Sequence, residues 1–207
     1  MASKTDILFS PPFTINIDPL TNKVVATIPI GGKPETAVSD EAGKLYVNNE
    51  DKSEIAVVDL KTFKVIDQWS IAPGEAPTGL AIDLKTKRLF TGCDKLLVVI
   101  DVTNGKIVDK LPIGNGCDGV AFDKKSKRIF TSNGEGTMTV IEEKSANSFS
   151  VLANIPTKKG ARTICLDEST HTIYLPTADF EPKANDENPK ARPKMIAGSF
   201  QVLTIKQ

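Results

Sequence analysis

The residues that could carry chemistry in this sequence are polar side chains that recur at similar positions about every 42 residues. Their oxygen atoms suit the binding of a cation or of a small polar ligand. The same side chains would also serve simply to cap strands and to hydrate a polar rim. Eight of them are candidate ligand-binding residues: Glu35, Asn49, Thr78, Asp94, Asp118, Asn133, Arg162 and Asp179.

Nucleophilic and cofactor chemistry find little support in the sequence. There is no Gly-x-Ser-x-Gly motif, and the single histidine, His171, falls in a predicted turn where we expect a solvated surface group. No CxxC pair marks a metal knuckle or a haem attachment site. No glycine-rich phosphate loop precedes a helix. We therefore assign no catalytic residue.

Composition and charge limit the classes of partner. The 207 residues are 40% hydrophobic and 25% charged, which suffices for a sizeable core. Because 26 basic residues balance 26 acidic ones, the zero net charge argues against a nucleic-acid partner. No apolar run reaches the ~18 residues of a membrane span, and the first residues lack the apolar run of a signal peptide. We expect no membrane partner.

An internal repeat positions the candidate residues. Four similar segments begin at Pro34, Pro77, Cys117 and Ala161, with spacings of 43, 40 and 44 residues. Each opens a unit of up to four short strands that are rich in β-branched and aromatic residues and are separated by Asp, Asn and Gly clusters. Four strands in about 42 residues is the arithmetic of a β-propeller blade.

The sequence therefore predicts an all-β fold, a β-propeller of four-stranded antiparallel blades with about four blades in this chain. We assign residues 1–207 to a single domain. It consists of a partial blade and four further blades, the last with an insertion at 177–198: 13–30, then about 31–72, 73–113, 114–156 and 157–207.

Propeller geometry predicts where the candidates lie. The starts of the first strands and the loops between the second and third strands gather at one mouth of the central channel. The strand starts hold Glu35, Thr78, Asp118 and Arg162. The loops hold Asn49, Asp94, Asn133 and Asp179. We therefore expect a polar mouth at which equivalent positions of successive blades carry different polar side chains.

Several recurring motifs carry a family resemblance. They are the segments Ile30–Pro34, Leu45–Asn49, Val57–Thr62 and Lys64–Ile66. They resemble the YVTN-type β-propeller repeat, and the closest group is the bacterial YncE-like proteins. The resemblance implies a periplasmic or secreted protein with a binding role, in a family whose members have seven blades, so that the first blades are lacking here. YVTN-type surface-layer repeats also suggest a structural repeat protein at a cell surface.

An enzymatic alternative comes from a different group. Gluconolactonase-like propellers hold a divalent cation with Glu, Asn and Asp near the channel axis. The comparable residues here are Glu35, Asn49, Asp118 and Asn133, although their order and spacing do not reproduce a metal motif. They would make the protein a divalent-cation-dependent lactonase or hydrolase, with a cation such as Ca²⁺ as its cofactor. Apart from that cation we expect no cofactor.

Counting strands raises the question of ring closure. Two strands at the front, three full blades and three strands at the end make 17. Lys23–Ile28 suits the fourth strand of the last blade, where Phe13–Asp18 and Phe200–Ile205 compete for the place beside it. Three architectures remain: a four-bladed ring with the first segment displaced, an open arc, or a head-to-tail homodimer closing the ring. The open arc is the least favourable because exposed strand edges invite association.

Cysteines and the insertion add two hypotheses. Cys93 and Cys117 fall in loops of adjacent blades at the predicted mouth, which allows a disulfide between them in an oxidising compartment. Cys165, on a first strand, is predicted to be a buried core residue. The insertion contains Phe180 and Met195, which would let it fold over the channel as a lid or remain a solvated loop.

These patterns favour a non-enzymatic β-propeller binding or scaffold module, whose polar mouth receives a small ligand or a protein partner. The lactonase-like enzyme and the cell-surface structural repeat are the alternatives.

Overall fold

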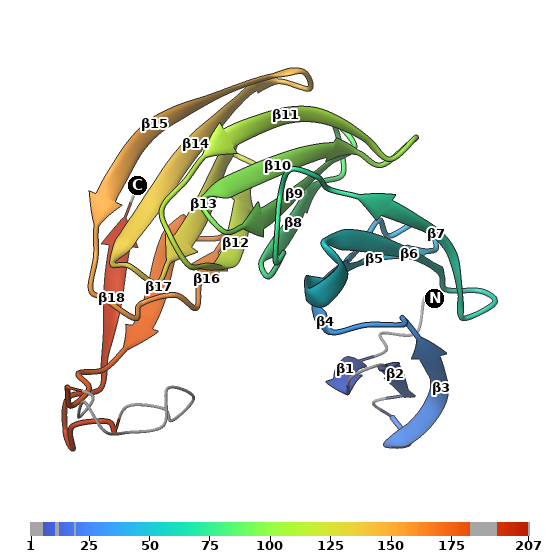
Figure 1. Ribbon diagram of the computed structural model, residues 1–207, viewed down its shortest axis with the longest axis horizontal. Coiled ribbons are helices and arrows are strands. Elements are labelled where there is room, and N and C mark those ends of the chain that lie inside the picture. The colour runs from blue at the N-terminus through green and yellow to red at the C-terminus, as the bar shows by residue number, and fades with distance from the viewer. Residues whose placement is uncertain (1–5, 11–12, 19, 183–193, 207) are drawn as a thin grey trace.

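The computed structural model describes residues 6–10, 13–18, 20–182 and 194–206, and their strands form five antiparallel sheets in chain order (Figure 1). We call these sheets blades 1 to 5. Blade 1 contains β1 (Asp6–Ser10), β2 (Phe13–Asp18) and β3 (Lys23–Pro29). Blade 2 contains β4 (Pro34–Ser39), β5 (Lys44–Asn49), β6 (Glu54–Asp59) and β7 (Lys64–Ser70), with a 3₁₀ turn, η1 (Glu50–Lys52), between β5 and β6.

The other three blades follow the same order. Blade 3 contains β8 (Leu80–Asp83), β9 (Arg88–Cys93), β10 (Leu96–Asp101) and β11 (Lys106–Pro112). Blade 4 contains β12 (Cys117–Asp123), β13 (Arg128–Asn133), β14 (Thr137–Ser145) and β15 (Ser148–Pro156). Blade 5 contains β16 (Cys165–Asp167), β17 (Thr172–Thr177) and β18 (Gln201–Lys206). No helix in the described part of the chain is long and apolar enough to cross a membrane.

Each blade pairs its strands with their sequence neighbours, so the chain runs from the inner side of the arc outward and then back for the next blade. Blades 2, 3 and 4 have four strands, whereas blades 1 and 5 have three. The described residues hold 18 strands, one more than the repeat predicts. The additional strand is β1, which precedes the first recognisable repeat motif and pairs with β2.

In blades 2 and 3 an acidic residue builds the turn from the third to the fourth strand. In blade 2, Asp59 Oδ1 accepts a hydrogen bond from the backbone N–H of Thr62 at 2.7 Å. This bond, together with those from the Thr62 hydroxyl and the Lys61 N–H, holds the pKa of Asp59 below its ordinary value. Across the sheet Asp59 lies opposite Lys64, and in blade 3 Asp101 lies opposite Lys106 in the same way. The pairs join opposite charges at the start of the outer strand.

In blades 2, 3 and 4 an aromatic residue of the second strand packs toward the following blade. Tyr46, Phe90 and Phe130 are almost fully buried. The ring of Phe90, for example, lies 5.3 Å from that of Phe122 in blade 4. Tyr174 holds this position in blade 5, where no described sheet follows, and it is only partly buried. The apolar core is accordingly divided into four clusters, one between each pair of successive blades.

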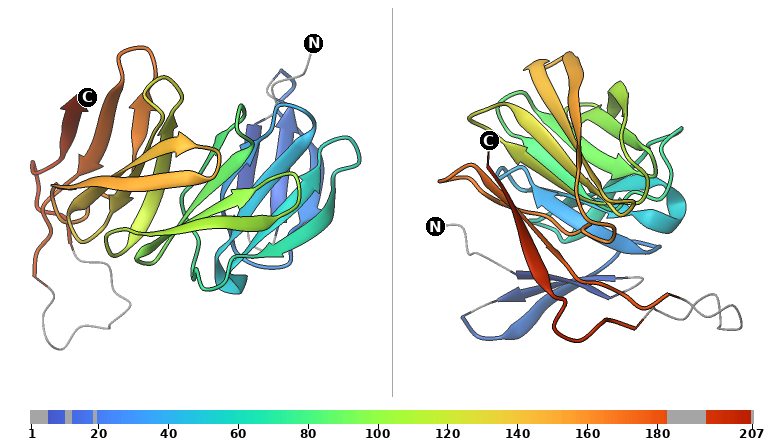
Figure 2. Two further views of the ribbon diagram at one scale, coloured as in Figure 1. Left: turned by 90° about the horizontal axis from the view of Figure 1, so that it is seen from above. Right: turned by 90° about the vertical axis from the view of Figure 1, so that its left-hand side faces the viewer.

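The five blades follow an open arc with blades 1 and 5 at its two ends (Figures 1 and 2). Among the three architectures that the sequence leaves open, the arc is expected to be the least favourable because its strand edges are exposed. The structure shows that this expectation is wrong. Because β3 pairs with β2, Lys23–Ile28 does not complete blade 5 within the chain. The third strand of blade 5 also begins one residue later than the repeat predicts, since Lys206 pairs with Thr172 as Asp59 pairs with Lys44.

Charged side chains join neighbouring blades at the turns between first and second strands. Lys127 Nζ of blade 4 lies 2.7 Å from Asp83 Oδ2 of blade 3 and 3.8 Å from Glu143 Oε2. In the next pair of blades, His171 Nδ1 lies 2.8 Å from Asp123 Oδ2, a carboxylate that is fully buried. The expectation of a solvated His171 is therefore wrong. The turn brings its ring against the preceding blade because Asp123 ends that blade's first strand.

Candidate functional site

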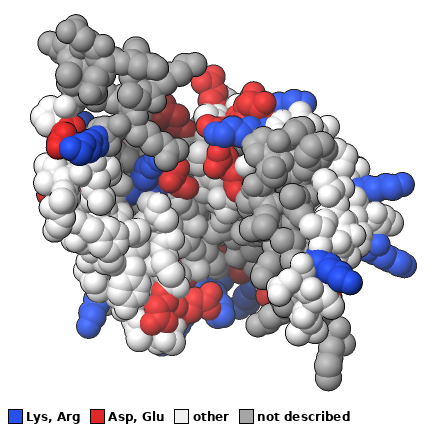
Figure 3. All heavy atoms as spheres, turned by 90° about the horizontal axis from the view of Figure 1, so that it is seen from below, with Lys and Arg blue, Asp and Glu red and all other residues white. Residues whose placement is uncertain are grey.

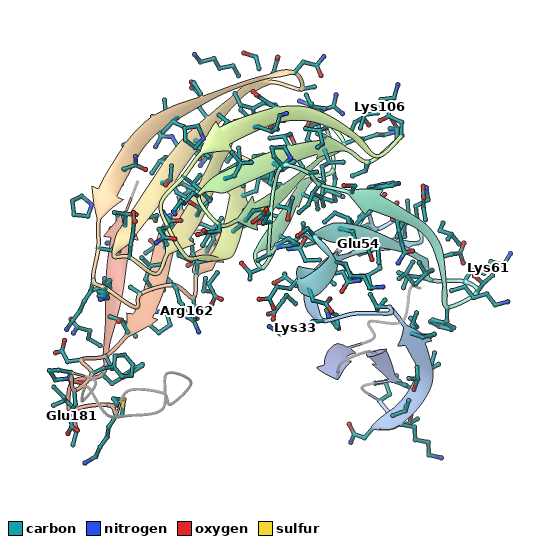
Figure 4. All side chains as sticks on the ribbon, in the orientation of Figure 1. Lys33, Glu54, Lys61, Lys106, Arg162 and Glu181 are labelled. Atoms are coloured by element: carbon teal, nitrogen blue, oxygen red, sulfur yellow. The ribbon has the colours of Figure 1, made fainter. Side chains whose placement is uncertain are left out.

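The predicted mouth is the inner side of the arc, where the starts of the first strands meet the loops between second and third strands. In Figure 4, Lys33 and Arg162 lie on this inner side, whereas Lys61 and Lys106 lie on the outer surface. Figure 3 views the molecule from the open side of the arc and shows acidic and basic side chains interspersed, without a large patch of one sign. The surface is therefore polar with mixed charge.

In blade 2, Glu35 lies at the mouth and is engaged by a lysine. Lys33 Nζ lies 2.7 Å from Glu35 Oε1 and forms a second ion pair with Glu50. Hydrogen bonds to these two carboxylates raise the pKa of Lys33 above its ordinary value. Because Lys33 and Glu35 are both accessible to water, solvent screens much of their attraction. Glu35 thus belongs to a small charged cluster.

Blades 4 and 5 contribute a charged pair that is exposed at the mouth. Arg162 Nε lies 3.6 Å from Asp118 Oδ2, and the arginine side chain is 62% exposed. The backbone carbonyl of Arg162 accepts a hydrogen bond from the Ser132 hydroxyl, which fixes the chain at this point. The guanidinium therefore faces solvent from an anchored backbone, an arrangement that suits recognition of a carboxylate.

Thr78 and Asp94 connect blade 3 to blade 4. The Thr78 hydroxyl donates a hydrogen bond to the Cys117 carbonyl at 2.7 Å, and Asp94 Oδ1 accepts one from the backbone N–H of Gly116 at 3.2 Å. Asn48, which the sequence reasoning missed, plays the same part between blades 2 and 3 by donating to the Thr78 carbonyl at 2.9 Å. The sequence signal that could have identified Asn48 was its position beside Asn49 in a buried strand. Thr78 therefore stabilises the frame.

Asn49 and Asn133 do not reach the surface of the mouth, because both side chains are fully buried. Asn49 Nδ2 donates to Glu54 Oε1 at 2.8 Å, and Asn133 Nδ2 donates to the Thr139 hydroxyl at 3.0 Å. The structure thus does not bring them together with Glu35 and Asp118 as one exposed ligand set. Within the described ranges, no group of three or more His, Cys, Asp or Glu side chains is arranged to hold a metal ion.

Asp179 lies at the base of the insertion. Its carboxylate pairs with Lys158 Nζ at 2.7 Å, and its carbonyl accepts a hydrogen bond from the Ile196 N–H at 2.8 Å. Phe180 and Met195 face each other in a short antiparallel bridge, and about half of each side chain is exposed. The predicted lid falls largely on residues 183–193, which lie outside the described residues.

The three cysteines are free thiols. Cys93 and Cys117 are buried in adjacent blades, and burial raises the pKa of Cys93 to about 12 and that of Cys117 further. Cys165 is exposed, so its prediction as a core residue is wrong. It lies opposite Tyr174 on the outer face of blade 5, a face that a following blade would have to cover.

A groove that the sequence reasoning missed lies between blades 4 and 5. It has a volume of about 340 Å³. Its walls are mainly apolar: Phe130, Met138, Val140, Leu152, Ile173 and Ile205. Arg128 and Lys206 also line it. The available signal was that the last repeat ends after its third strand, which leaves the side of β18 without an outer neighbour among the described strands.

Comparisons with known proteins bear on the fold. No family model matches the chain, and no curated protein does. Among solved structures, a chain of Kuenenia stuttgartiensis hydrazine synthase is 19% identical over 97% of this chain, with a TM-score of 0.70. A chain of the mitotic checkpoint complex is 13% identical over 83%, with a TM-score of 0.71.

The matched part covers 59% and 56% of those two chains, so this chain spans less than two thirds of either. At such low sequence identity the likeness concerns the fold alone. Together with the succession of antiparallel sheets around an arc, it establishes that the chain has a β-propeller fold.

Proposed function

We propose that this protein is a non-enzymatic binding module that receives a protein or peptide partner at the mixed-charge surface on the inner side of the arc. The observation that carries the proposal is the Asp118–Arg162 pair, whose arginine is anchored through its backbone yet exposes most of its side chain. Arginine beside a carboxylate offers a partner both a donor and an acceptor of charge-assisted hydrogen bonds. The neutral net charge of the chain fits a mixed-charge partner better than a polyanion.

The lactonase-like alternative is less well supported. It requires Glu35, Asn49, Asp118 and Asn133 to present oxygen atoms to one cation, whereas both asparagines are buried and donate hydrogen bonds to neighbouring strands. Membership of the YVTN-type repeats, an exported location and a structural role at a cell surface remain proposals that rest on the sequence motifs. A ring-closing homodimer likewise remains a proposal, and light scattering at micromolar concentration tests it.

The proposed function is tested by selecting binders from a random peptide library displayed on phage, with the whole chain as target. We expect selected peptides to bind the charge-reversed variants Asp118→Arg and Arg162→Asp about tenfold more weakly than the wild type, the effect of losing one interfacial charge pair of ~1.4 kcal/mol. Binding to Lys106→Glu should be unchanged, because Lys106 lies on the outer surface.

The result that overturns the proposal is a set of binders that are indifferent to Asp118 and Arg162. Peptides that lose affinity only for Lys206→Glu bind at the groove between blades 4 and 5 instead, and they count against the mouth. Metal analysis after calcium supplementation addresses the enzyme alternative, which a stoichiometric divalent cation together with lactone hydrolysis would support.

A further inference from the structure

The outer edge of β18 is open. In blades 2, 3 and 4 the third strand is paired on both sides, as β10 is with β9 and β11. β18 is paired with β17, and no other described strand lies along its second edge (Figure 2). The backbone N–H and C=O groups on that side are therefore available to an added strand.

The groove beside β18 corresponds to space that fourth strands fill elsewhere. Val65 of β7 lies opposite Val58 and packs into the core between blades 1 and 2. Ile107 of β11 lies opposite Ile100 and packs in the same way between blades 2 and 3. Ile205 is the corresponding residue of β18, and it lines the groove without such a partner. An apolar side chain opposite Ile205 would therefore fill the groove.

The groove also exposes apolar surface of blade 4. Leu152 of β15 lines it, and 47% of that side chain is accessible to water. Burying such a side chain on binding is favourable because it removes apolar surface from water.

The charge at the end of β18 is reversed relative to the other blades. The third strands of blades 2 and 3 end in Asp59 and Asp101, and each lies opposite the lysine that begins the fourth strand. β18 ends its pairing with Lys206 at the equivalent position, because Lys206 pairs with Thr172 as Asp59 pairs with Lys44. A complementary strand should thus begin with an acidic residue, since opposite charges across a strand pair attract and like charges repel.

We propose that the open edge of β18 and the groove beside it bind an extended segment of a partner protein as the fourth strand of blade 5. The segment runs antiparallel to β18, with an acidic residue opposite Lys206 and an apolar residue opposite Ile205. On the other face of the sheet, away from the groove, a second apolar residue lies opposite the half-exposed Val202, just as Trp69 lies opposite Ile55 in blade 2. This site is separate from the mouth, so either proposal can fail without the other.

The test uses two fluorescent peptides that differ in one residue. The probe has the sequence of Lys106–Pro112 with Asp in place of the first Lys, and the control has the unchanged sequence of Lys106–Pro112. Fluorescence anisotropy with the whole chain should show saturable binding of the probe and at least about fivefold weaker binding of the control, the effect of one cross-strand charge pair of ~1 kcal/mol. Lys206→Glu should reverse this preference.

A second pair of variants tests the groove. Leu152→Asp should weaken binding of the probe, whereas Ile66→Asp, a similarly exposed apolar residue on the outer strand of blade 2, should not. Circular dichroism verifies that each variant is folded. The proposal is overturned if a scrambled peptide binds as well as the probe, or if Lys206→Glu leaves the preference unchanged. It is also overturned if light scattering finds a dimer that excludes the probe, because a second copy would then occupy the edge.

Discussion

His171 and Asp123 connect the last two blades by a contact of 2.8 Å between Nδ1 and a buried carboxylate oxygen. Lys127 and Asp83 make the equivalent contact one blade earlier, at 2.7 Å. The two cationic or polar side chains occupy the same place in their turns, with backbone φ values of 55° and 57°. A position that looks like a surface turn in one repeat is thus a junction between repeats.

Replacing His171 with alanine should lower the free energy of unfolding by about 1–3 kcal/mol, because Asp123 would lose a hydrogen-bond partner while remaining buried. Urea unfolding followed by circular dichroism measures the change. Lys124→Ala is the matched control, since Lys124 pairs with Glu168 at the surface, where solvent screens the attraction, and the substitution should have the smaller effect. Equal effects of the two substitutions would count against a structural role for His171.

Glu143→Gln should change how stability depends on pH. Burial, with Asp83 nearby, raises the pKa of Glu143 above its ordinary value of 4.5. The folded wild type therefore retains this proton at a pH where the unfolded chain has released it, and its unfolding free energy falls as pH rises above about 4.5. Glutamine carries no such proton, so the stability of the variant relative to wild type should rise over the same range.

Asp83→Asn should change the pH dependence of the unfolding free energy in the opposite direction. Although burial opposes the effect, the ammonium of Lys127 lowers the pKa of Asp83 below 3.8. The wild type therefore gains stability from this carboxylate above that pH and loses it as pH falls through the lowered value. Relative to wild type, the variant should be least stable near neutral pH. Urea midpoints from about pH 3 to pH 8 distinguish the two slopes, and parallel curves would contradict both assignments.

Thiol reactivity should separate the three cysteines. Cys165 is exposed, whereas Cys93 and Cys117 are buried with raised pKa values, which leaves little thiolate at neutral pH. A titration of the reduced native protein with a thiol reagent should therefore modify one cysteine rapidly, and Cys165→Ser should abolish that fast phase. Fast modification that survives in Cys165→Ser would show that a buried thiol is accessible.

Tyr46 and Tyr174 allow a matched test of the end of the arc. Tyr46→Ala should cost about 3–5 kcal/mol of unfolding free energy, because it empties a buried contact between blades. Tyr174→Ala should cost less than half as much, since no described sheet covers its outer side. The comparison should be repeated over a range of protein concentration. A large cost for Tyr174→Ala that grows with concentration would indicate that a second copy covers blade 5.

The repeat made most of the fold predictable. Tyr46, Phe90, Phe130 and Tyr174 recur at one position, the third residue of the second strand in blades 2 to 5. β1 escaped prediction because its blade lacks a first strand and so presents no repeat start. The position of β18 was wrong by one residue because Lys206 stands where Asp59 and Asp101 end the third strands of blades 2 and 3.

The site was less predictable, because burial depends on what lies beside a strand. Asn49 and Glu35 have similar polarity in the sequence, yet one side chain is buried in hydrogen bonds and the other is at the surface. Cys165 has the apolar neighbours of a core residue, but it faces the open end of the arc. The β-propeller frame could thus be inferred from periodicity, whereas the groove at β18 required knowledge of which edges are paired.

The open arc also determines where the protein is weakest. In a closed ring every blade is held by two neighbours, whereas here blades 1 and 5 are each held by one. In such a linear array, stability is close to a sum of contributions from each unit and each junction. The end blades should therefore fray first, and their amide hydrogens should exchange with solvent well before those of blade 3. The central blades should therefore be rigid and the two end blades more mobile. A partner that binds an end blade should reduce its mobility.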